Sequence, residues 1–148
     1  MPSIIPSYVY TLFACMIVGA LLIGASSLSS IRVKNEADLQ ELKNIADYVA
    51  TTSFELVSST KTNNLTAKFI LSIPAVVGNQ RYWVQLDNDS FRCWVNIGFG
   101  TTPHSGGQQT YIPSNVAAFG DYVSGAGIPV LRCYNDGSAI YLEISEGV

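Results

Sequence analysis

Few residues in this chain have side chains that could carry out chemistry. The 148 residues include one histidine and three cysteines, too few to suggest a metal site or a thiol-dependent enzyme. His104 lies in the stretch Thr-Pro-His-Ser-Gly-Gly, and no Asp, Cys or Ser pattern indicates that it acts as a base. Phosphate-binding glycine loops, paired-carboxylate motifs and haem motifs are absent from the sequence. We therefore expect no enzyme activity, no catalytic residue, no metal and no cofactor.

Two of the cysteines could instead form a structural bond. Cys93 alternates with Phe91 and Val95, and Cys133 has the same phase as Leu131, so both are predicted to point inward from β-strands. A Cys93–Cys133 disulfide would suit a head domain outside the cytoplasm. The alternative is that both are buried free thiols that act as small apolar residues.

Two short motifs are acceptors for N-linked sugar. They are Asn64-Leu65-Thr66 and Asn88-Asp89-Ser90, and both fall where the chain is expected to turn at the surface. Because the chain is rich in Asn, Ser and Thr, chance matches to this pattern are expected. We treat Asn64 and Asn88 as candidate glycosylation sites.

Aromatic residues offer a possible binding surface. Tyr82, Trp83, Trp94 and Tyr111 lie on predicted strands and could form a surface on which sugar rings stack. The competing interpretation is that they fill the core or pair across strands.

The elements that must position these residues begin with an uncharged segment. No charged side chain occurs before Arg32, and Tyr8 to Ala25 is almost entirely apolar. At about 1.5 Å per helical residue, this run nearly spans a hydrocarbon core of about 30 Å. The segment accounts for much of the low charged fraction, 13%, and for the positive mean hydropathy of +0.26.

Three interpretations of this segment compete. A cleaved secretory signal is disfavoured because no basic region precedes the apolar run, which exceeds the usual length of about 7–15 residues. A single-pass membrane anchor is the simplest alternative. The third is a helix that leaves the membrane to pack in a protein assembly. Small residues at i,i+4 spacing support close helix packing; they are Cys15 with Gly19 and Ala20 with Gly24.

The segment that follows is predicted to continue the same helix. Apolar or small side chains recur with a period of about 3.6 residues. They are Val33, Ala37, Leu42, Ile45, Ala46, Val49, Ser53 and Leu56. With no Gly or Pro between residues 26 and 59, we expect one helix of about 55 residues, roughly 80 Å long, over residues 1–60. Its first part, 1–31, is hydrophobic and its second part, 32–60, is amphipathic.

Residues 61–148 are predicted to form a small antiparallel β head, so the fold class is α+β. Strands are expected over 66–73, 81–86, 90–100, 109–113, 129–135 and 138–144, and most of 100–127 is expected to be loop. The Asp136-Gly137 pair predicts a hairpin between the last two strands. Short connections favour antiparallel pairing.

This organisation resembles the type IV pilin superfamily, in particular its archaeal branch of pilins, archaellins and archaellum-associated proteins. The stretches Asn44–Ala50 and Arg81–Leu86 are similar to those of archaeal pilin-like proteins. The resemblance implies that helices bundle into a filament core and that heads, often glycosylated, form the outer surface. Ile5 stands where bacterial pilins carry a glutamate, as suits an archaeal-type subunit. The family's basic leader does not precede Met1, so either it was removed from this numbering or the protein is an uncleaved relative.

The function expected from these features is that of a structural subunit of an extracellular pilus-like filament that serves adhesion or surface contact. Its partners would be copies of itself, the membrane before assembly, an assembly machinery and a surface or glycan ligand. The net charge of −3 argues against a nucleic-acid partner. The alternative is a membrane-anchored binding module, such as an archaellum stator, and an anchored envelope enzyme is the least favoured.

Overall fold

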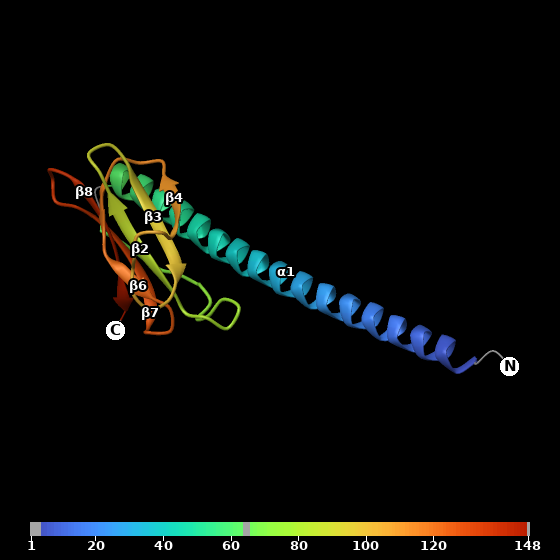
Figure 1. Ribbon diagram of the computed structural model, residues 1–148. Helices are drawn as coiled ribbons and strands as arrows, with labels where there is room; N and C mark the ends of the chain where they lie inside the picture. The colour runs from blue at the N-terminus through green and yellow to red at the C-terminus, as the bar shows by residue number, and fades with distance from the viewer. Residues whose placement is uncertain (1–3, 64–65, 148) are drawn as a thin grey trace. The chain divides into compact units, whose positions relative to one another are not determined.

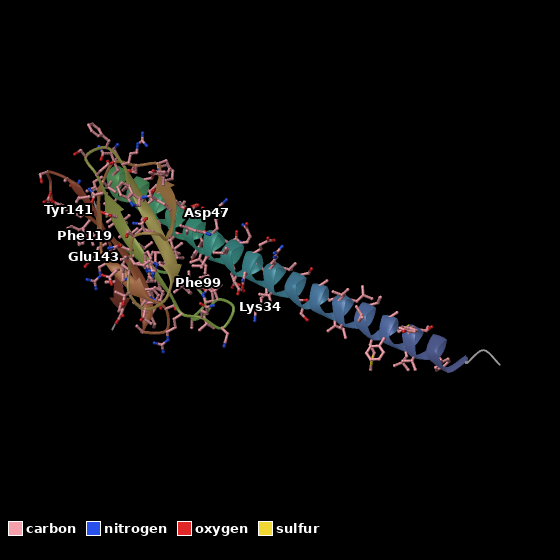
Figure 2. All side chains as sticks on the ribbon, in the orientation of Figure 1. Lys34, Asp47, Phe99, Phe119, Tyr141 and Glu143 are labelled. Atoms are coloured by element: carbon pink, nitrogen blue, oxygen red, sulfur yellow. The ribbon has the colours of Figure 1, made fainter. Side chains whose placement is uncertain are left out.

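The computed structural model describes residues 4–63 and 66–147, and its fold is α+β. Among these residues, one helix, α1 (Ile4–Asn63), precedes eight strands. Figure 1 shows the helix and the strands that follow it. The predicted unbroken helix is confirmed. The chain divides into two compact units, residues 1–37 and residues 38–148. The second unit therefore contains the C-terminal half of α1 together with all of the strands.

The strands form two four-stranded sheets. The first has the order β1-β7-β8-β5 and the second has the order β4-β3-β2-β6. The bounds are β1 (Ala67–Ile70), β2 (Tyr82–Asn88), β3 (Cys93–Phe99), β4 (Gln108–Ile112), β5 (Ala117–Phe119), β6 (Asp121–Val123), β7 (Ile128–Asn135) and β8 (Ile140–Gly147). The six predicted strands are all present in some form, and the stretch expected to be loop also holds β5 and β6.

Strands β5 and β6 follow each other in the chain but belong to different sheets. β5 pairs with β8 in parallel, whereas β6 pairs with β2 in antiparallel orientation. Pairing in the head is therefore antiparallel, as expected, except at β5, which lies in the stretch expected to be loop. The chain changes sheet at Gly120, whose φ of +101° favours glycine and whose added Cβ would clash with the Ile144 carbonyl oxygen. Three-residue strands beside a glycine give little periodic signal, which explains why the sequence does not reveal them.

The predicted hairpin between the last two strands is confirmed. β7 and β8 pair over eight residues, from Ile128 opposite Gly147 to Asn135 opposite Ile140. In the turn, Asp136 accepts hydrogen bonds from the backbone N–H groups of Ser138 and Ala139 and from the Ser138 hydroxyl. These bonds, the Ser138 hydroxyl first, lower the pKa of Asp136 to about 2.

The C-terminal half of α1 belongs to the core of the head. One buried cluster contains side chains from this part of the helix and from both sheets. The buried helical positions recur every three or four residues, as a single face requires. They are Leu42, Ile45, Ala46, Val49, Ala50, Thr52, Ser53, Leu56, Val57 and Thr60. The head thus includes about two dozen helical residues that complete its interior.

The beginning of the predicted stripe does not follow this face. Val33 is 65% exposed and Ala37 is also exposed, whereas Leu42 is 1% exposed. At about 3.6 residues per turn, Val33 lies roughly two and a half turns before Leu42 and therefore on the opposite side of the helix. The predicted stripe is therefore confirmed from Leu42 onward. It is wrong at Val33 and Ala37, which lie away from the buried side of the helix.

Candidate functional site

The uncharged half of α1 presents apolar side chains on all sides. Among the described side chains before Arg32, the large hydrophobic ones from Tyr8 to Ile31 are 48% to 75% exposed. By length and composition this region could cross a membrane, with a mean hydropathy of 2.1 over its most apolar window. A surface of this kind is stable only when lipid or other protein covers it.

The four small residues singled out for packing lie within this half. In the single chain, a Cβ added at Gly19 or Gly24 meets no other atom within 4 Å. Cys15 is exposed, and its thiol is free. Cys15 and Gly19 share one side of the helix, while Ala20 and Gly24 share another, because 3.6 residues make a turn. Two sides of the helix therefore offer room for close approach by a neighbouring backbone.

A run of serines separates the apolar half from the first charges. The hydroxyls of Ser26, Ser27, Ser29 and Ser30 each donate to the carbonyl four residues earlier, at 2.9 to 3.1 Å. Such bonds satisfy the hydroxyls within the helix itself. This segment can therefore remain in apolar surroundings without unpaired donors.

The predicted Cys93–Cys133 disulfide is not formed. Both thiols are buried, as predicted, but both are free. Cys93 is in β3 and Cys133 in β7, which belong to different sheets. The Cys93 thiol donates to the Ser114 carbonyl at 2.9 Å, and the Cys133 thiol lies beside the Thr60 hydroxyl of α1. The two strands are held in separate sheets, and each thiol has its own neighbour in the core.

We expect the two buried thiols of the head to react slowly while the head is folded. Burial raises the pKa of both the Cys93 and the Cys133 thiol, so neither forms the reactive thiolate readily near neutral pH. In the folded head, an alkylating reagent at pH 8 should leave both Cys93 and Cys133 unlabelled. After unfolding, it should label both, as peptide mass spectrometry without reduction would show. A Cys93–Cys133 cross-linked peptide would contradict the structure.

The phenylalanine expected beside Cys93 in the core is instead at the surface. Phe91 is 81% exposed and precedes β3 in the turn after β2. Asp89 holds this turn by accepting hydrogen bonds from the N–H groups of Phe91 and Arg92, both at 2.7 Å. These bonds lower the pKa of Asp89. The alternating pattern therefore begins at Cys93, and Phe91 is displayed at the hairpin tip.

The two candidate glycosylation sites have different status. Asn64 lies outside the described residues. Asn88 is exposed at the last position of β2, immediately before the turn held by Asp89. Its side-chain amide makes a 3.4 Å contact with the Asp89 carbonyl, which is a weak hydrogen bond. Asn88 is thus accessible to modification.

His104 has a packing role. Its ring meets Trp83 edge to face, with the ring centroids 5.3 Å apart. Trp83 is 1% exposed although it lies on the outer side of its sheet, because residues from the loop between β3 and β4 cover it. An added Cβ at Gly107 would come within 2.8 Å of the Trp83 ring. No group of three or more potential metal ligands occurs among the described residues.

The structure separates the four aromatic residues that the sequence grouped. Tyr82 points into the core and Trp83 is covered, so neither is available to a ligand. Trp94 and Tyr111 lie side by side on the outer face of the second sheet, with ring centroids 6.2 Å apart.

Comparison with protein-family models, curated proteins and solved structures finds no match to this chain.

Polar residues next to this ring pair were not identified from the sequence. Asp121, Gln85, Asn96 and Gln109 are cross-strand neighbours on β6, β2, β3 and β4. They form one row across the outer face of the second sheet. In the sequence, each of these residues stands at an outward-pointing position of its strand. That position does not reveal that pairing of the four strands brings them into one row.

Proposed function

We propose that this protein is the structural subunit of an extracellular pilus-like filament, assembled through its N-terminal helices, with the β head displayed for adhesion or surface contact. The observation that carries the proposal is the uncharged helical surface before Arg32, whose described large apolar side chains are 48% to 75% exposed, joined without a break to a helix half that completes the head. Burying each large apolar side chain contributes roughly 1.5–3 kcal/mol, which is a strong drive to cover this surface.

A filament covers such a surface by repetition. Successive copies can meet through two different surface patches. When the rotation between copies does not complete a closed ring, such contacts generate an open helical polymer. Small residues on two sides of the helix, at Cys15 and Gly19 and at Ala20 and Gly24, let each helix meet more than one neighbour. The serine hydroxyls, which bond within their own helix, are compatible with burial among other helices.

The second candidate is a single-pass, membrane-anchored binding module. The observation in its favour is that the same helix is long and apolar enough to cross a membrane. In this alternative, lipid covers the helix permanently and the head acts as a monomer. Both candidates place the helix in lipid at some stage, so membrane association does not distinguish them.

The distinguishing experiment is assembly from purified full-length protein. The protein is extracted in detergent, the detergent is removed by dialysis with and without added lipid, and the product is imaged by electron microscopy. Filaments of uniform diameter formed without lipid support the proposal. Protein that enters lipid vesicles and forms no filaments under either condition supports the anchored module instead.

Glycosylation of the head is a further prediction of an extracellular location. Protein from its native source should carry sugar at Asn88, and Asn64 is a second candidate. The measurement is the mass of the peptides that contain each asparagine, before and after chemical deglycosylation. Replacing Ser90 by alanine removes the acceptor motif and leaves Asn88 in place, which makes it the control. An unmodified Asn88 peptide from native filaments would contradict this prediction.

A further inference from the structure

We propose that the outer face of the sheet β4-β3-β2-β6 is a binding platform for a neutral saccharide. The inference deepens the proposed function: it rests on that function for the display of the head at the cell surface, while the binding chemistry belongs to the head. The platform consists of the polar row Asp121, Gln85, Asn96 and Gln109 and of the adjacent residues Asp87, Trp94 and Tyr111.

Strand register creates the polar row. Gln85 is paired with Asp121 on one side and with Asn96 on the other, and Asn96 is paired with Gln109. Neighbouring strands lie about 4.8 Å apart, so the row across four strands is roughly 14 Å long. That length accommodates more than one sugar ring.

The functional groups of the row match sugar hydroxyls. A hydroxyl both donates and accepts hydrogen bonds, and an amide side chain does the same, while a carboxylate accepts. In the described part of the chain, the amides of Gln85 and Asn96 have no hydrogen-bond partner, and both side chains are partly exposed. Gln109 is exposed and contacts the Tyr111 hydroxyl at 3.4 Å. The amides of Gln85 and Asn96 are therefore available to a ligand, and the Gln109 amide, whose oxygen accepts from Tyr111, still has its N–H donors.

The second row supplies aromatic surface beside the amides. Asp87 is paired with Trp94, which is paired with Tyr111. The two rings meet at an interplanar angle of 70°, and the Arg92 guanidinium lies 5.8 Å from the Tyr111 ring centre. These contacts fix the orientation of a ring that is 54% exposed. An open hollow of about 480 Å³ next to Tyr111 and Arg92 extends the surface at one end.

The composition of this face argues against other classes of partner. The core of a protein interface is depleted of charged residues, whereas each of the two rows carries a carboxylate, Asp121 in the first and Asp87 in the second. A nucleic-acid site needs clustered cations, whereas these rows carry Asp87 and Asp121. Asp87 and Asp121 repel anionic sugars, and the charge of Arg92 beside Tyr111 offsets only part of this repulsion, which is why we assign a neutral saccharide.

The test is binding of the full-length protein to immobilised neutral oligosaccharides. The panel consists of oligomers of glucose, mannose, galactose and N-acetylglucosamine. The protein is kept in a zwitterionic detergent, because detergents with sugar head groups would compete. The variants are Tyr111→Ala and Asn96→Ala, and each is expected to weaken binding by about tenfold, the effect of one lost stacking or hydrogen-bonding group. Phe119→Ala, which removes an exposed ring from the outer face of the other sheet, should bind like the parent.

The outcomes separate this inference from the proposed function. Absence of binding to every oligosaccharide, or equal binding by Tyr111→Ala, Asn96→Ala and the parent, would overturn the platform even if filaments form. Tighter binding to an oligouronate would overturn the neutral assignment. Sugar binding by a parent protein that never forms filaments would leave the platform standing and remove the filament.

The saccharide could come from another cell surface or from the protein's own glycan. An Asn88→Gln variant of natively produced protein distinguishes these sources. Stronger binding of free oligosaccharide by this variant assigns the platform to the protein's own sugar. Unchanged binding assigns it to an external glycan.

Discussion

Replacing Gly24 by leucine is expected to abolish filaments and to leave the amount of membrane-bound protein unchanged. In the single chain, the position of a Cβ at Gly24 is open space, so the substitution is compatible with the helix itself. In a filament, the larger side chain would push apart two helices whose backbones approach closely at this position. Facing lipid, it would only add another apolar side chain.

The measurement combines electron microscopy with quantification of the protein in membranes. Gly19→Leu tests the second side of the helix in the same way. Ile17→Leu is the matched control, because it keeps an apolar side chain of similar size at an exposed position that already holds a large residue. Filaments of normal length in both glycine variants would show that the helices meet through other positions. Loss of the protein from membranes would attribute the defect to insertion.

Replacing Val49 by aspartate is expected to unfold the head. Val49 is 0% exposed and belongs to the cluster shared by α1 and both sheets. A charge placed there has no partner, and the cost of burying it is several kcal/mol, comparable to the entire stability of a small domain. The head would lose its cooperative thermal unfolding transition, which circular dichroism measures.

Thr51→Asp is the matched control for this variant. Thr51 is exposed on the same helix two residues later, so a carboxylate there remains in water. Its unfolding temperature should differ from that of the parent by no more than a few degrees. A Val49→Asp head that melts like the parent would mean that the C-terminal half of α1 is not part of the head's core.

The amino-acid sequence by itself determined the helix and most of the strands. The uncharged run before Arg32 and the lack of Gly or Pro from 26 to 59 predict a single helix, because both properties are local. The alternation of Cys93, Val95 and Ile97 predicts the inward face of β3 for the same reason, and Asp136-Gly137 predicts the last hairpin. All of these depend on residues a few positions apart.

Only the tertiary structure decided how distant segments meet. Two inward-pointing cysteines are compatible with a disulfide, and the placement of β3 and β7 in separate sheets leaves both thiols free. Trp83 and Trp94 are both outward residues of neighbouring strands, yet a loop covers the first and leaves the second partly exposed. Asp121 reaches the row of amides only because the chain changes sheet at Gly120. The physical reason is that alternation defines which face a residue occupies, whereas strand order and register depend on packing between segments far apart in the chain.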